Sequence, residues 1–157
     1  MSRDTQNTLT MKDARIAGAL YLIIAVCGGF SIGYVPSQIV MAGDASSTAA
    51  NLIDQLGLFR LGVIADSAVI LLEIAITVIL YQMFRTTSPR LSLIAMVSRL
   101  GMIVVMGINL LLWVMPFVLL IQPMGLNTTA TQAFAQIVFE AHALGIYVWQ
   151  LFFGAHL

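Results

Sequence analysis

The sequence predicts an all-α integral membrane protein, an antiparallel bundle of four membrane-spanning helices. Its 157 residues are 60% hydrophobic and only 9% charged, whereas a soluble domain is roughly one quarter charged. The mean hydropathy is +0.97, and a soluble core in so short a chain cannot bury that much apolar surface. The formal net charge is zero, and no basic run is dense enough to bind nucleic acid.

Four long apolar stretches are the predicted spans, at about residues 16–35, 58–84, 91–121 and 132–157. Each reaches the roughly 20 residues that a hydrocarbon core of about 30 Å requires. Lys12 and Arg15 before the first stretch raise the alternative of a cleaved secretory signal. The run is longer than an ordinary signal core of about 7 to 15 residues, which favours a retained span.

Proline and polar residues mark the ends of these spans. We expect Pro36 to end the first helix and Pro116 to kink the third, because proline lacks an N–H group and clashes with the preceding turn. A short amphipathic helix at about residues 46–56 suits the membrane interface. Residues 1–12 are predicted to be a flexible tail, residues 85–90 a basic turn and residues 122–131 a polar loop.

The distribution of basic residues predicts the orientation, since cytoplasmic loops carry an excess of Lys and Arg. The basic residues near the span ends on one side, the predicted cytoplasmic side, are Arg3, Lys12, Arg15, Arg85 and Arg90. Only Arg60 falls near the opposite side. We therefore expect a multi-pass protein of the cell membrane with a cytoplasmic amino terminus.

Acidic residues inside the spans are the best lead to function, because an ionised carboxylate in lipid costs several kcal/mol unless it is neutralised or paired. Asp66 and Glu73 are two turns apart and share one helix face. Counted from the basic turn, Glu73 and Arg99 lie at about 18 Å and 13 Å depth. These depths predict an ion pair, the alternative being that Arg99 extends to the headgroups and Glu73 is protonated.

Asp66, Asn109 and His142 lie at comparable depths from the other side and are predicted to form a polar cluster. A His beside a carboxylate in a membrane is suited to a proton relay. The alternative is that these side chains form hydrogen bonds that fix helix packing. Glu140 lies about 200° around the helix from His142, so it belongs instead to the outer interface with Arg60.

These residues leave more than one function open. The first hypothesis is a non-enzymatic protein that moves or senses a proton or small solute, and the second is a structural or partner-binding subunit. A further alternative is a dimer that binds b-type haem through His142 and His156. No metal motif, phosphate-binding loop or nucleophile motif appears, so we expect no metal, no other cofactor and no enzymatic activity. The expected partners are membrane lipids and a second copy or another membrane protein, without nucleic acid.

Several polar positions recur in an order that resembles a known family. The segments that carry this resemblance are residues 14–22, 43–45, 48–51, 58–62 and 142–154. The chain is similar to the bacterial membrane family catalogued as domain of unknown function 4386. That resemblance implies that residues 1–157 are the amino-terminal part of a single six-span domain. It implies no activity.

Overall fold

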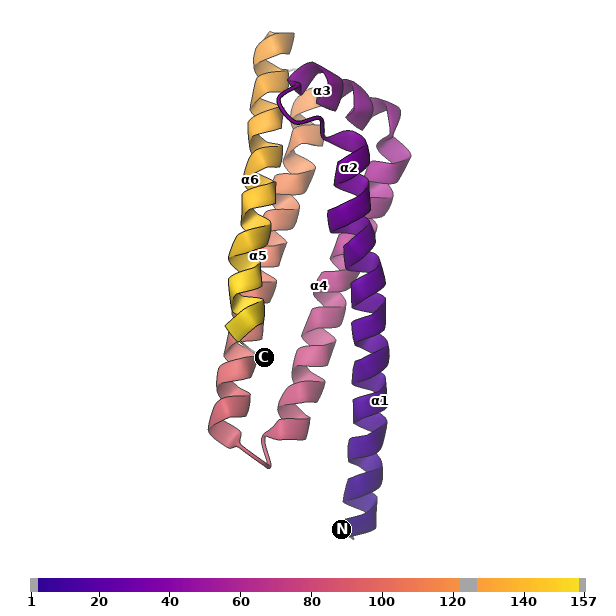
Figure 1. The fold of residues 1–157 in the computed structure, drawn as a ribbon, viewed down its shortest axis with the longest axis vertical. Coiled ribbons are helices and arrows are strands. Elements are labelled where there is room, and N and C mark those ends of the chain that lie inside the picture. Colours follow the sequence, from indigo (N-terminus) through magenta and orange to yellow (C-terminus); the bar gives the residue numbers. More distant parts are fainter. Residues whose placement is uncertain (1–2, 122–126, 156–157) are drawn as a thin grey trace.

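The computed structural model describes residues 3–121 and 127–155, and every regular element in these ranges is a helix (Figure 1). The predicted all-α class is confirmed. The elements are α1 (Arg3–Gly28), the π-helical segment η1 (Gly29–Tyr34), α2 (Val35–Ile39), α3 (Ala45–Asp54), α4 (Leu56–Phe84), α5 (Pro89–Ile121) and α6 (Thr128–Ala155).

Among the residues that the structure describes, four helices are long and apolar enough to cross a membrane. Their bounds are Met11–Ile39, Leu56–Phe84, Pro89–Ile121 and Thr128–Ala155. In the bundle α1 packs on α4, α4 on α5 and α5 on α6, and consecutive long helices run in opposite directions (Figure 1). Helix α3 lies across one end of the bundle, where it contacts α2, α4 and α6. We call this the α3 end and the opposite one the turn end.

The first span extends beyond its predicted limit at Pro36, and that prediction was wrong. Helical structure continues through η1 into α2, which ends at Ile39. Pro36 occupies the first turn of α2, where a proline is tolerated because the first N–H groups of a helix have no partner within it. The extension matters for packing, because Val35 and Ile39 are both fully buried.

Two other boundaries also differ from the prediction. Helix α1 begins at Arg3, within the segment predicted to be a tail. Helix α6 begins at Thr128 rather than at residue 132, because the Asn127 side chain accepts a hydrogen bond from the Ala130 N–H at 2.8 Å and so caps the helix. Pro116 lies inside α5, which stays one helix from Pro89 to Ile121.

The predicted interfacial helix is present as α3, and its side chains fasten it to the end of the first span. Gly43 has a φ of 75°, a value that favours glycine in the turn before the helix. Thr48 hydrogen-bonds both the N–H and the C=O of Met41, at 2.9 and 3.2 Å. The Asn51 and Gln55 amides donate to the carbonyls of Ile39 and Gln38, at 3.3 and 2.9 Å. These contacts satisfy carbonyl groups that the end of α2 leaves without helical partners.

An aromatic cluster fills the bundle near α3. Trp113 stands between Phe59 and Phe139, with ring centroids 5.6 and 5.0 Å away. The same cluster includes Val35, Ile39 and Leu52. A second apolar cluster lies further along the bundle and consists of Val69, Met102, Ile103 and Met106. Most other apolar side chains of the spans face outward, as expected of helices surrounded by lipid.

Asp44 yields a pH prediction for α3. Its carboxylate accepts hydrogen bonds from the Ser47 N–H and hydroxyl, at 2.9 and 2.7 Å, and these bonds lower the pKa of Asp44 below its ordinary value. The cap should therefore contribute fully above the unfolded-state pKa of about 4 and be lost as the pH falls through the lower folded-state pKa. We expect Asp44→Ala to lower the midpoint of thermal unfolding in detergent at pH 7, and the gap to wild type to narrow at pH 3 and below.

Asp44→Asn is the matched control, since it keeps an uncharged acceptor at the N-cap. Its midpoint relative to Asp44→Ala should not change between the two pH values. If the difference in unfolding midpoint between wild type and Asp44→Ala were the same at pH 7 and pH 3, the Asp44 charge would not stabilise α3.

Candidate functional site

A buried ion pair joins α4 and α5 near the middle of the bundle. The Arg99 Nη2 donates to the Glu73 Oε2, and the two residues are only 2% and 3% exposed. The ion pair predicted from residue depth is thus present, and Arg99 does not extend to the surface. Glu73 and Arg99 lie about 17 and 15 Å from the turn-end limits of their helices at 1.5 Å per residue, so they meet at nearly one level.

Further hydrogen bonds hold the Arg99 guanidinium in place. Its Nε donates to the Thr77 Oγ1 and its Nη1 to the Tyr21 hydroxyl, both at 2.9 Å. The Thr77 hydroxyl in turn donates to the Glu73 carbonyl at 2.6 Å. Arg99 also lies over the Tyr21 ring, 5.6 Å from its centroid. Because Tyr21 belongs to α1, one side chain ties together three of the four spans.

Sequence reasoning missed Tyr21 and Thr77. Thr77 follows Glu73 by one helical turn on the same face, so the spacing could have identified it. Tyr21 offers only a hydroxyl in an apolar stretch, and nothing in the sequence fixes which helix it faces.

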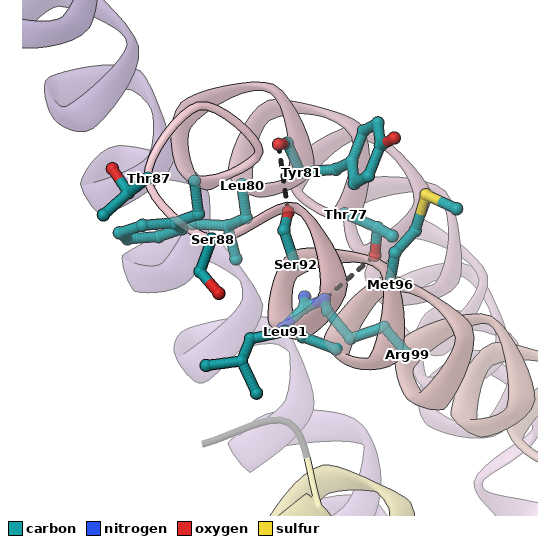
Figure 2. A pocket seen from close by; sticks show the side chains of 11 residues that line it. Thr77, Leu80, Tyr81, Thr87, Ser88, Leu91, Ser92, Met96 and Arg99 are labelled. Atoms are coloured by element: carbon teal, nitrogen blue, oxygen red, sulfur yellow. Dashed lines mark hydrogen bonds between the residues drawn. The ribbon is translucent and has the colours of Figure 1, made fainter.

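Two cavities adjoin the ion pair. The first, of about 300 Å³, lies between α4 and α5 beside the turn that joins them, and Arg99 and Thr77 line it (Figure 2). At its other limit the Ser92 hydroxyl donates to the Tyr81 carbonyl at 3.1 Å. We call it the turn-side cavity. The second, of about 480 Å³, is lined by residues of all four spans, including Glu73 and Gln150. We call it the central cavity.

The chain directions place these cavities on opposite sides of the ion pair. Helix α1 runs toward α3, and its lining residues Ile24 and Gly28 follow Tyr21 in that direction. Helix α4 runs the other way, and Val69 of the central cavity precedes Glu73. The central cavity therefore lies toward α3 and the turn-side cavity toward the α4–α5 turn. Glu73 lines the former and Arg99 the latter.

The structure brings together only two members of the predicted polar cluster. His142 Nδ1 donates to the Asn109 carbonyl at 3.0 Å, and its ring centroid lies 5.0 Å from that of Trp113. Asp66 instead lies near Ser31 of η1, whose hydroxyl donates to the Gly28 carbonyl at 3.4 Å. Within residues 3–121 and 127–155, no hydrogen bond or ion pair joins Asp66 to Asn109 or His142. Asp66 therefore stays a predicted member of the cluster, because depth fixes the level of a residue but not the rotation of its helix.

Asn109 makes an unusually close contact with α6. Its side chain is 5% exposed and the Oδ1 has no hydrogen-bonding partner in the part of the chain that the structure describes. A Cβ atom at Gly145 would lie 1.9 Å from this oxygen. Gly145 is one turn beyond His142, so the glycine lets α6 approach α5 at the level of the His142 hydrogen bond.

The two residues assigned to the outer interface are exposed on the surface of the bundle. Arg60 lies on the surface of α4, one turn from its first residue. Glu140 accepts a hydrogen bond from Gln136 at 3.2 Å and is also exposed. Phe139, its neighbour, belongs to the same apolar cluster as Leu52 of α3, which places Glu140 near the level of the interfacial helix.

The other suggested ligands do not form a described site. His156, which the haem alternative requires, lies outside the described residues. Within the described residues, no three His, Cys, Asp or Glu side chains lie close enough to hold a metal ion. Cys27 is a partly buried free thiol that packs against the second apolar cluster.

Four antiparallel apolar helices around a buried ion pair define a multi-pass helical membrane protein. The family described as Domain of unknown function (DUF4386) matches residues 16–157, and the chain belongs to this family. A comparison of this chain with curated proteins and with solved structures found no match. The family description states no activity, so function has to be inferred from the site.

The contact of Gly145 with Asn109 predicts a specific steric effect. Gly145→Ala should lower stability by about 1–3 kcal/mol, because the new methyl group overlaps a carboxamide that has little room to rotate. Asn109→Ala in the same chain should restore much of the loss by removing the overlapping atom. The measurement is chemical unfolding of purified protein in detergent, analysed as a double-mutant cycle.

Gly107→Ala on α5 is the matched control, since a Cβ atom there meets nothing within 4 Å. It should be neutral or slightly stabilising, because alanine favours helix over glycine. If Gly145→Ala behaved like Gly107→Ala, the close approach of α5 and α6 would be wrong.

Proposed function

We propose that this protein moves or senses a proton or small polar solute in the membrane, with the Glu73–Arg99 ion pair as its working element. The observation that carries the proposal is the position of the ion pair between two cavities, one toward each end of the bundle. A species that moves along the bundle from one cavity to the other would pass beside this pair. The pair therefore has the position of a barrier.

Glu73 is the group suited to accept a proton at this barrier. Protonation would remove its attraction for Arg99, but Thr77 and Tyr21 would still accept hydrogen bonds from the guanidinium. The buried cation would therefore keep polar partners in both states of Glu73. The additional acceptors distinguish this site from a buried ion pair in which each charged group has the other as its sole polar partner.

A second candidate function is a structural or partner-binding membrane subunit, which a different observation favours. His142 is fixed between the Asn109 carbonyl and the Trp113 ring. It therefore has the surroundings of a packing residue. Hydrogen bonds of this kind between membrane helices contribute about 0.6–2 kcal/mol, which suits a role in assembly.

Reconstitution in liposomes separates the two functions. We expect wild-type protein to admit protons, driven by a potassium diffusion potential and read by an internal pH dye, faster than protein-free liposomes. The double variant Glu73→Gln/Arg99→Gln should fall to the protein-free rate, because it has no carboxylate between the cavities. Removing both charges leaves no uncompensated buried ion, so this variant should fold.

Glu140→Gln is the matched control, because it neutralises an exposed carboxylate away from the ion pair. It should keep the wild-type rate. Helical content and the unfolding midpoint establish that the double variant is folded. A folded double variant with the wild-type rate, or wild-type protein with only the protein-free rate, would contradict proton movement through this site.

We also propose that the amino terminus and the α4–α5 turn are cytoplasmic and that α3 faces outward. The Lys and Arg residues near the turn and before the first span support this orientation. In a Cys27→Ala background, a membrane-impermeant maleimide should label Ser46→Cys on intact cells. It should label Thr87→Cys only after permeabilisation. The reverse labelling pattern would contradict this orientation and show that α3 faces the cytoplasm.

A further inference from the structure

The central cavity has the composition of a small-molecule site. Its volume is about 480 Å³ and its walls are mostly apolar, with Ile24, Met106 and Phe153 among the lining residues. Two polar side chains reach it from facing helices, Glu73 from α4 and Gln150 from α6. Cavities that bind small ligands typically combine apolar walls with a few such polar groups.

Only one oxygen of the Glu73 carboxylate is engaged. Arg99 donates to Oε2, and no residue in the ranges 3–121 and 127–155 donates a hydrogen bond to Oε1. Glu73 is nevertheless 97% buried, since its exposed fraction is 3%. A carboxylate oxygen inside a protein normally accepts a hydrogen bond. The oxygen that lacks one belongs to a side chain on the cavity wall, where a ligand could supply the donor.

The position of the cavity indicates how a ligand would reach it. Residues of both α1 and α6 line the cavity, yet these two helices do not pack extensively on each other. Gly28 at the end of α1 and Gly29 at the start of η1 have open space where a side chain would be, and Gln150 on α6 is exposed. A ligand can therefore approach between the two helices, from the hydrocarbon region of the bilayer.

We propose that the central cavity binds small amphipathic amines, whose ammonium group donates to the Glu73 Oε1 while the apolar body lies against Ile24, Met106 and Phe153. The inference rests on the proposed function and supplies the substrate class of the same site. A carboxylate selects a cationic donor, and the apolar walls select an apolar body. The exposed Gln150 amide can hydrogen-bond a polar substituent of the ligand.

Occupancy would act on the ion pair. An ammonium group at Oε1 stands beside the same carboxylate as Arg99, so the two cations share one negative charge and repel each other. Thr77 and Tyr21 can retain the guanidinium as its bond to Glu73 weakens. Binding in the central cavity would thus loosen the barrier toward the turn-side cavity.

The probe is 1-adamantylamine, a compact amine, with 1-adamantanol as a neutral compound of nearly the same shape. Titration calorimetry on the full chain in detergent, corrected with empty micelles, should show saturable amine binding. The alcohol should bind about tenfold or more weakly, the expected loss of a charge-assisted hydrogen bond. Glu73→Gln should reduce amine affinity to that of the alcohol, and Glu140→Gln should leave it unchanged.

Gly28→Leu is the second variant, for the case that Glu73→Gln does not fold. A Cβ atom at Gly28 meets nothing within 4 Å, so the leucine should fill the cavity without disturbing the ion pair. We expect it to abolish amine binding with an unchanged unfolding midpoint. Equal binding of amine and alcohol, or unchanged binding in Gly28→Leu, would overturn the proposal. The proposal would also be overturned if the purified wild-type protein were a dimer that binds no amine and the Gly28→Leu variant were a monomer. A second copy of the chain would then occupy the cavity.

This experiment separates the inference from the function on which it rests. The liposome assay contains no amine, and the calorimetric assay needs no transport. Intact proton movement without amine binding would overturn the substrate class alone. Amine binding without proton movement would leave a ligand site and overturn proton transport.

Discussion

The buried Arg99 guanidinium is the constraint on which the middle of the bundle depends. An arginine cannot lose its charge in a protein and carries five N–H donors, so its burial among apolar helices requires several acceptors at fixed positions. Glu73 and Thr77 supply them from α4 and Tyr21 from α1. The need to satisfy one side chain therefore fixes the level and rotation of α1 and α4 relative to α5. Removing Arg99 alone would leave the Glu73 charge without its partner, at a cost of about 3–5 kcal/mol.

The α3 end of the bundle is held by different means. There the Trp113 cluster and the hydrogen bonds of Thr48, Asn51 and Gln55 join the spans without any buried charge. Gly62 lets α4 approach the first span, since a Cβ atom at this position would lie 3.0 Å from Val35. Several segments that carry the family resemblance fall in this region. Their residues build the scaffold, and the cavities lie nearer the ion pair.

Composition and spacing were enough to predict the four spans, the interfacial helix and the ion pair, because each depends on length or on depth along a helix. Depth alone could not establish the grouping of Asp66 with His142, because that grouping also needs the rotation of α4 about its axis. That rotation follows from long-range packing, including the approach of η1 to Asp66. The continuation of the first span past Pro36 was missed for a related reason. Proline ends a regular helix, but here it follows a π-helical segment and occupies the first turn of α2.

The π-helical segment η1 lies between the ion pair and the α3 end of the bundle. Segments of this kind are frequent at functional sites. Here η1 contributes Gly29 and Ile32 to the wall of the central cavity and places Ser31 near Asp66. Asp66 and Glu73 share a face of α4 about 10 Å apart along the axis. Under the proposed function, a proton that enters near α3 would therefore meet Asp66 first, then the central cavity, and then Glu73. Asp66 and Glu73 would in this way act in series along one face of α4.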